Sequence, residues 1–347
     1  MRRRTFITLL GGTMAAWPLS ARAQQAGGRL RRVGILMPYP QTEQEIQERV
    51  RAFKEELHRL GWIEGSKIAF DERWTTDNMD LVRSNAASLV ESNPDAIVAI
   101  GGRVIPILKQ TTHSVPIVVM TVDLIGTGMV ASLAHPGENI TGFSVFELSI
   151  IGKMLALLKE IAPNVSSVAL IYNPDNPSTA FFQREFENAA PALAIAPVIA
   201  HIHGLDDVAR AIEEMARLPN GGLLFAGDVT VHALREQVVT LAASKRLPAI
   251  YSEPALVKSG GLASYSPDRI DLFRRSAGLC RPHPARREAG RFAGAAADEI
   301  RVPRQPEDRQ IAWPGFARPA ARARQRGDRK NRRTFITLLG GAAASPT

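Results

Sequence analysis

The sequence predicts an α/β fold made of two doubly wound lobes with a cleft between them. Short, continuous apolar runs alternate with longer amphipathic stretches from Arg32 onward. The alternation restarts near Val168, so the same pattern occurs twice in succession. Each copy holds about 100 residues, a normal size for one domain. Continuous apolar strands separated by helices are typical of parallel sheets that are covered on both faces.

The first half contains four predicted strands, at residues 32–37, 67–74, 96–100 and 116–120. Residues 43–60, between the first two strands, carry apolar side chains three and four positions apart, which is typical of one helix face. These side chains are Ile46, Val50, Phe53, Leu57 and Leu60. Gly61 follows in the position of a C-terminal helix cap. A second helix is expected over 81–90, and Gly101-Gly102 allows a tight turn into a third.

The second half repeats the pattern, with predicted strands at 168–172, 197–202, 222–226 and 248–251. Helices are expected between them, over 179–193, 208–218 and 231–244. We therefore place the first lobe at residues 30–143 and the second at 144–265, joined near Thr141 to Phe146. Ligands of doubly wound sheets bind beyond the carboxyl ends of the strands. Two lobes with those ends facing each other would form a ligand cleft.

Residues 1–23 have the layout of a secretory signal peptide. Met1 to Arg4 is cationic, Phe6 to Leu19 is apolar, and Ala21-Arg22-Ala23 is a small-x-small cleavage site. The apolar stretch is too short, and too interrupted by glycine and proline, to span a bilayer. The Arg3-Arg4 pair also resembles a twin-arginine signal, so both the Sec and the Tat route stay open. We expect export to a bacterial periplasm.

The last part of the chain differs in composition from the rest. Residues 279–330 are rich in arginine, alanine and proline and hold a single lysine. Residues 332–341 repeat residues 3–12 letter for letter, where no export machinery would read them. The repeat indicates that the reading frame shifts near Gly278 and that translation then continues into the start of a related gene. We expect 279–347 to be an out-of-frame, unstructured tail and the chain to be poorly soluble; the alternative is a basic tail that binds nucleic acid.

The charge of the chain comes largely from its two ends. The formal net charge is +9, yet between Gln24 and Gly278 the chain holds 24 Lys and Arg against 28 Asp and Glu. The body is therefore mildly acidic, and a nucleic-acid partner is not indicated. The only cysteine, Cys280, lies at the start of the tail. A disulfide, a thiol nucleophile and a cysteine metal site are thus excluded for the body.

Several strings in the body resemble a known family. Two are fairly specific together, Pro136-Gly137-Glu138-Asn139-Ile140-Thr141-Gly142 and Leu247-Pro248-Ala249-Ile250-Tyr251. The strand strings Asp95-Ala96-Ile97-Val98-Ala99 and Pro116-Ile117-Val118 and the string Gly260-Gly261-Leu262-Ala263-Ser264-Tyr265-Ser266 add to them. Together, over about Arg32 to Gly278, they resemble the ABC transporter substrate-binding proteins of the tryptophan/tyrosine type.

The resemblance implies a type I periplasmic-binding-protein fold, in which two Rossmann-like lobes close over a small molecule. The implied function is to bind an amino acid or a related organic solute and to present it to a membrane permease. It further implies that residues 266–278 begin a crossover back toward the first lobe, and that a strand and a helix should follow Gly278. We expect a periplasmic monomer whose partners are the solute and the permease, with no nucleic acid, no cofactor, no metal and no enzymatic activity.

Loops that follow strands supply the candidate ligand-binding residues. They are Tyr39, Gly101, Gly102, Thr121, Asp123, Asn173, Asp228 and Tyr251. Such pockets need backbone N–H groups for a carboxylate, an acid for an ammonium group and aromatic rings for an apolar side chain. Asp123 and Asp228 could instead be helix N-caps, and Asn173 could serve its turn with Pro174. We expect Tyr251 to face the pocket rather than the core.

An enzyme is the main alternative. Residues 126–131 fit a G-x-G-x-x-A dinucleotide pattern that starts at Gly126, with Glu147 roughly 20 residues further on. This alternative is an NAD(P)-dependent oxidoreductase. The glycines come several residues after their strand rather than in its first turn, which favours close helix packing instead. A further alternative is a nonfunctional product of a frameshifted gene.

Overall fold

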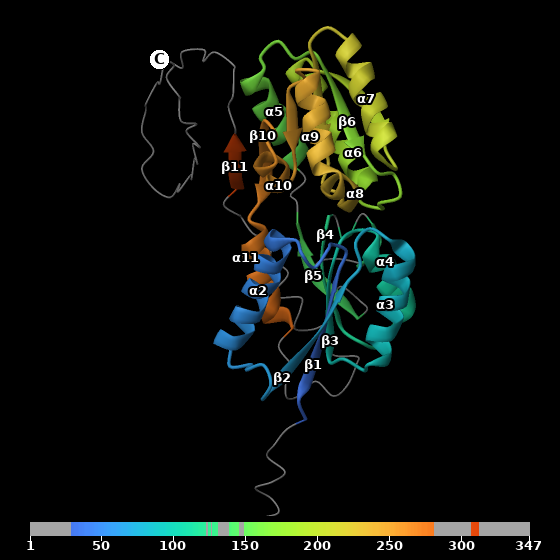
Figure 1. The fold of residues 1–347 in the computed structure, drawn as a ribbon, viewed down its shortest axis with the longest axis vertical. Helices are drawn as coiled ribbons and strands as arrows, with labels where there is room; N and C mark the ends of the chain where they lie inside the picture. Colours follow the sequence, from blue (N-terminus) through green and yellow to red (C-terminus); the bar gives the residue numbers. More distant parts are fainter. Residues whose placement is uncertain are drawn as a thin grey trace, which may run out of the picture.

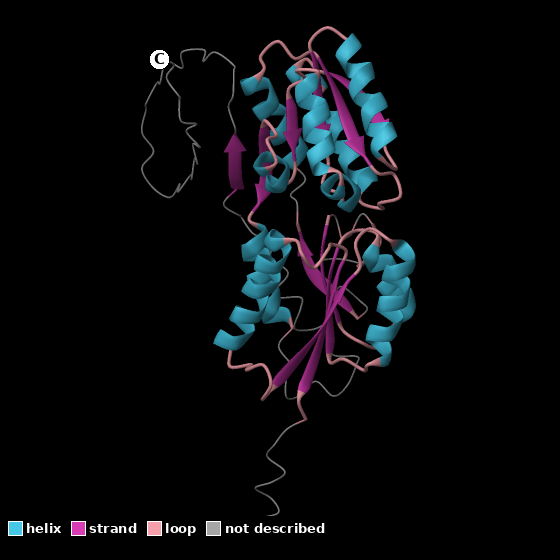
Figure 2. Ribbon diagram, viewed as in Figure 1, coloured by secondary structure: helices cyan, strands magenta, loops and turns pink. Residues whose placement is uncertain are grey.

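The computed structural model describes residues 29–122, 124–125, 127–130, 139–145, 149–280 and 307–311. Two α/β lobes follow one another along the long axis of the molecule, the first at the bottom of Figure 1 and the second at the top. Helices flank the strands of both lobes (Figure 2). In the described part of the chain, no helix has both the length and the apolar character needed to cross a membrane.

The first lobe is built on five parallel strands in the order β2-β1-β3-β4-β5. The strands are β1 (Arg31–Met37), β2 (Ile68–Trp74), β3 (Ala96–Ile100), β4 (Ile117–Thr121) and β5 (Ile140–Ser144). Side chains alternate between the two faces of this sheet. Val33 and Ile35 of β1 pack in the cluster that holds α2 (Gln44–Arg59), while Leu36 packs with α3 (Met79–Glu91) and α4 (Val104–Thr111). The sheet is therefore doubly wound, as the sequence predicts.

The second lobe has the strand order β11-β10-β9-β8-β6-β7. The strands are β6 (Ser167–Tyr172), β7 (Ala196–His201), β8 (Gly221–Phe225), β9 (Ala249–Tyr251), β10 (Ala263–Pro267) and β11 (Glu307–Ile311). All pairs are parallel except that of β10 with β11. One face packs with α5 (Ile150–Ile161) and α6 (Thr179–Ala189), and the other with α7 (Leu205–Arg217) and α9 (Arg235–Ser244). The remaining short helices are α8 (Val229–Ala233), α10 (Pro254–Lys258) and the 3₁₀ turn η1 (Pro191–Leu193).

The link between the lobes and one predicted helix differ from the sequence prediction. The expected link at 141–146 begins inside strand β5, which pairs with β4. Gly142 of β5 lies so close to β4 that an added Cβ would stand 1.9 Å from the carbonyl oxygen of Val119. The expected helix 231–244 is divided at Leu234 into α8 and α9.

The chain crosses from the second lobe back to the first after β10. Helix α11 (Arg269–Leu279) lies beside α2 in the lower lobe of Figure 1 and contacts β4 and β5. Its apolar side chains Leu272, Phe273 and Ala277 are buried in one cluster with those of α2, and Cys280 is buried with them. Ordered structure therefore continues through Cys280, beyond Gly278, where the tail was expected to begin.

Strand β11 also differs from the expectation of an unstructured tail. Glu307–Ile311 pairs antiparallel with β10 at the edge of the second sheet. Without a partner on that side, β10 would leave a row of backbone N–H and C=O groups unpaired, and an extended segment of almost any sequence satisfies them. Residues 281–306 and 312–347 lie outside the described residues, as does the expected signal peptide at 1–23.

Candidate functional site

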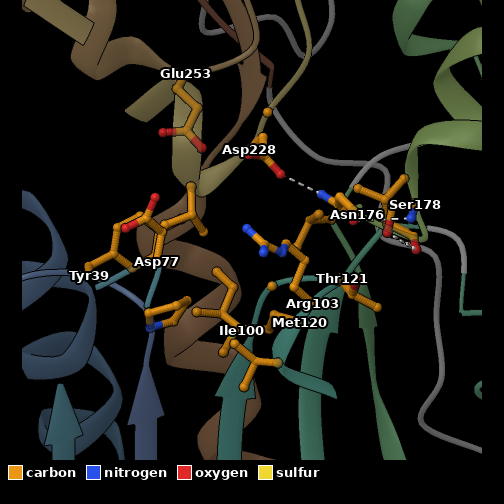
Figure 3. A pocket seen from close by; sticks show the side chains of 18 of the residues that line it. Tyr39, Asp77, Ile100, Arg103, Met120, Thr121, Asn176, Ser178, Asp228 and Glu253 are labelled. Atoms are coloured by element: carbon orange, nitrogen blue, oxygen red, sulfur yellow. Dashed lines mark hydrogen bonds between the residues drawn. The ribbon is translucent and has the colours of Figure 1, made fainter. Parts of the chain in front are cut away.

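The carboxyl ends of the strands in both sheets meet at one cleft. Loops that follow β1 to β5 line it from the first lobe, and loops that follow β6, β8, β9 and β10 line it from the second. The cleft encloses about 590 Å³, including space open to solvent, which is within the usual range for a small-molecule site. Figure 3 shows the side chains converging on it from both lobes. This is the arrangement that the doubly wound pattern predicts.

The first lobe presents hydrogen-bond donors to the cleft. The backbone N–H groups of Gly102 and Arg103, just before α4, have no acceptor among the described residues. The hydroxyl group of Thr121, at the end of β4, is buried and has no partner there either. The Arg103 guanidinium points into the cleft (Figure 3). N–H groups at a helix start and an arginine attract a negatively charged group.

The second lobe presents an acid. Asp228 follows β8 and caps α8, accepting a hydrogen bond from Thr230 N at 2.8 Å. Its other carboxylate oxygen accepts from Asn176 Nδ2 at 2.9 Å. Burial raises the pKa of Asp228 above its ordinary value, although these hydrogen bonds and Arg103 oppose the shift. A buried carboxylate of this kind gains from an added cation, such as a ligand ammonium group.

A second group of charges lines the cleft beside Tyr39. The Glu253 carboxylate lies 2.9 Å from His232 Nδ1 and 3.9 Å from Arg269 Nη2. Burial alone would raise the pKa of Glu253, but His232, Arg269 and Arg49 outweigh it and lower the pKa to about 2. The carboxylate is therefore ionised, and its charge is balanced within the protein.

Five of the eight predicted site residues line the cleft: Tyr39, Gly101, Gly102, Thr121 and Asp228. Tyr39 is 4% exposed, and its ring meets that of His232 edge to face at 5.0 Å rather than lying open. Asp228 is both an N-cap and part of the lining. Gly101 has a φ of +100°, which suits the turn that glycine was expected to make.

Two predicted residues lie behind the cleft instead. Asn173 donates to Thr230 Oγ1 at 3.0 Å and accepts from Asp175 N at 2.9 Å, so it fixes the loops rather than lining the cleft. Tyr251 is 1% exposed and stacks on Phe225 with ring centroids 5.3 Å apart, in the core of the second lobe rather than the pocket. Asp123 lies outside the described residues, as does Gly126 of the dinucleotide pattern.

Sequence reasoning did not identify the lining residues Asp77, Ser178 and Arg269. Arg103, Asn176 and Glu253 also line the cleft; they lie in loops that were candidates because they follow predicted strands, although their side chains were not singled out. Arg269 stands at the start of a helix that follows β10 and crosses to the first lobe. Its signal was Asp268, an N-cap residue directly after a strand. In the described part of the chain, no three His, Cys, Asp or Glu side chains gather as metal ligands would.

Known proteins share this fold. A tyrosine-binding protein of Clostridioides difficile (strain R20291) is 27% identical over 214 residues, which cover 61% of each chain. The matched region thus spans less than two thirds of that relative. Among solved structures, a conserved domain protein from Vibrio cholerae superposes with a TM-score of 0.72 at 23% identity, covering 82% of this chain and 92% of that one. A Streptococcus pneumoniae ABC domain in complex with L-Trp gives 0.67 at 21% identity, with 72% and 83% covered.

These likenesses show the type I periplasmic-binding-protein fold. The ABC transporter substrate binding protein family matches residues 42–279, well over half of the chain. That range takes in the first lobe from α2 onward, strands β6 to β10 of the second lobe and helix α11. The chain therefore belongs to the family of ABC transporter substrate binding proteins.

Proposed function

We propose that the chain binds a small zwitterionic solute, an amino acid or a related molecule, between its lobes. The observation that carries this proposal is the opposite character of the two walls. Hydrogen-bond donors that have no acceptor within the described part of the chain come from Gly102, Arg103 and Thr121 on one lobe, and the buried Asp228 carboxylate comes from the other. A carboxylate on the first wall and an ammonium group on the second would neutralise both. A solute held by both lobes favours the closed arrangement through its extra contacts.

The relatives support an amino acid as the solute. One is named a tyrosine-binding protein and another was solved in complex with L-Trp. The apolar part of the lining, which includes Ile100, Met120 and Val145, suits the side chain of such a solute. The closed protein would act in the periplasm and deliver the solute to the permease of an ABC transporter, without chemical change to the solute.

Thermal melting of the purified chain tests the proposal. The standard L-amino acids are added one at a time, with NAD and ATP as controls for a nucleotide site. At a concentration of 100 times Kd a ligand stabilises the folded state by about 2.7 kcal/mol, which raises Tm by several degrees. We expect a rise with at least one amino acid and none with the nucleotides. A rise with NAD alone would support an oxidoreductase instead.

Asp228→Asn tests the site itself. Asparagine keeps the shape and the N-capping ability of aspartate but removes the charge. We expect the affinity for the amino acid, measured by calorimetry, to fall roughly 10- to 100-fold, since a charge-assisted hydrogen bond is lost. Asp207→Asn is the matched control, because Asp207 also accepts a backbone N–H near a helix start but lies outside the cleft. Equal affinities of the two variants would show that the Asp228 carboxylate does not bind the solute.

A further inference from the structure

The two lobes touch directly beside the cleft. The turn after β3, with Gly102 and Arg103, meets the loop that leads into α6. Ser178 Oγ of that loop donates to the carbonyl oxygen of Val122 at 3.4 Å, and Arg103 Nη2 lies 4.0 Å from Asp175 Oδ2. Each contact joins one lobe to the other, so each exists only while the lobes are together.

Gly102 is the tightest point of this contact. A Cβ atom added there would lie 2.1 Å from Asn176 Oδ1 and 2.8 Å from Ser178 Oγ. Both distances are far below van der Waals contact, so no side chain larger than hydrogen fits at position 102 in this arrangement.

The Asn176 amide cannot turn aside without loss. Its Oδ1 accepts a hydrogen bond from Ser178 N at 3.1 Å, and its Nδ2 donates to Asp228 Oδ2 at 2.9 Å. Asn176 is also buried, so water does not replace a broken bond at once. Moving the amide would therefore disturb the carboxylate that faces the cleft.

The turn itself does not require glycine at position 102. Gly101 has a φ of +100°, a value that disfavours other residues, whereas Gly102 is absent from the positive-φ residues of the described chain. Alanine at 102 is thus compatible with the local backbone. The contact between the lobes, and not the turn, therefore requires glycine at position 102.

We propose that Gly102 sets the closing equilibrium of the two lobes, and through it the affinity for the solute. The proposal rests on the solute-binding function given above. A Cβ at position 102 holds the first lobe away from Asn176 and lowers the population of the closed state. The apparent Kd rises by the factor by which that population falls.

The test combines small-angle X-ray scattering with calorimetry on the full chain. The probe is the standard L-amino acid that gives the largest rise in Tm. The wild-type radius of gyration should fall when the probe is added, and that of Gly102→Ala should fall much less. The Gly102→Ala affinity should be roughly 10- to 100-fold weaker, since closing then costs the Asn176 hydrogen bonds. Gly152→Ala in α5 is the control, because its Cβ would make an ordinary 3.6 Å contact with Ala189.

A double-mutant cycle separates closure from direct contact with the solute. In a background that carries both Asn176→Ala and Ser178→Ala, the Cβ at 102 meets neither the amide nor the hydroxyl oxygen, so Gly102→Ala should cost less than threefold there. An undiminished loss in that background would mean that residue 102 acts on the solute itself, and would overturn the proposal. Closure of Gly102→Ala with wild-type affinity would overturn it too, while leaving solute binding intact. If the wild-type chain binds none of the amino acids, that result would contradict the proposed function and this inference as well.

Discussion

Glu253 shows how single residues tie the cleft to the fold. Its carboxylate is buried, yet His232 and the two arginines Arg269 and Arg49 keep it ionised, with a pKa of about 2. His232 belongs to α8, Arg49 to α2 and Arg269 to α11. One carboxylate thus compensates charges that three separate helices bring together.

This arrangement predicts a pH dependence. The pKa of Glu253 falls from an ordinary value of 4.5 to about 2 on folding, so its contribution to stability is complete above pH 4.5 and disappears as the pH falls toward 2. We expect Glu253→Gln to lower the free energy of unfolding at pH 7 by on the order of 3 kcal/mol, since it removes the buried negative charge that attracts His232, Arg269 and Arg49. The difference from wild type should shrink between pH 4.5 and pH 2.

Urea unfolding at a series of pH values measures this difference. Glu48→Gln is the control, because Glu48 is a partly exposed carboxylate on α2 that bonds only Gln44 among the described residues. A gap between wild type and Glu253→Gln that stayed constant down to pH 2.5 would contradict the assignment of the charge to Glu253.

The sequence predicted the loops of the site better than its side chains. Tyr39, Gly101, Thr121 and Asp228 follow apolar runs, and the carboxyl ends of parallel strands gather ligand-facing loops. Tyr251 was expected in the pocket but lies in the core of the second lobe. It ends β9, a strand of only three residues. So short a run does not fix which face a side chain takes, and a shift of one residue reverses it.

At the scale of elements, the sequence did not predict strands β5, β10 and β11, and β5 shows the physical reason. Its run Ile140–Ser144 contains Thr141 and Gly142 and is short, so it has the pattern of a link. Glycine is needed there because the strand runs against β4, with Val119 directly opposite. Strands β1 to β4 and β6 to β9 and most helices followed from apolar periodicity alone. The break between α8 and α9 did not follow from periodicity, because the residues of both helices favour helical structure.

Gly142→Ala should therefore destabilise the first lobe. Its Cβ would overlap the Val119 carbonyl oxygen, and a backbone atom cannot move aside as a side chain does. We expect a loss of more than about 2 kcal/mol in the free energy of unfolding, measured with urea. Gly278→Ala on α11 meets no atom within 4 Å and should be neutral or slightly stabilising. Equal stabilities of the two variants would argue against the close approach of β5 to β4.

At the scale of the whole molecule, the two-lobed plan was visible in the sequence because the strand and helix pattern occurs twice. Periodicity carries no information on which lobe a returning helix joins, so the crossover of residues 266–278 to the first lobe was expected from the family resemblance and not from the pattern. The family match ends at residue 279, close to Gly278, where the composition changes. We propose that the reading frame slips at this point.

Genomic sequencing on both sides of the Gly278 codon tests the frame. We expect a one- or two-nucleotide insertion or deletion whose correction yields a sequence with an apolar strand and a helix. The corrected chain should also be more soluble than the chain as it stands, because the missing elements would cover apolar surface of the second lobe. An uninterrupted frame, with an intact mass that includes residues 279–347, would show that the arginine-rich end is an inherent part of the protein.

Helix α11 has a consequence for biogenesis. The first lobe is synthesised early, yet part of its helical layer comes from residues 269–279, which pack on α2 and against β4 and β5. The first lobe of a nascent chain therefore exposes an uncovered apolar flank until about 135 residues beyond β5 have left the ribosome, a topology that slows folding. The first lobe of such a polypeptide therefore completes its packing only after residues 269–279 have been synthesised.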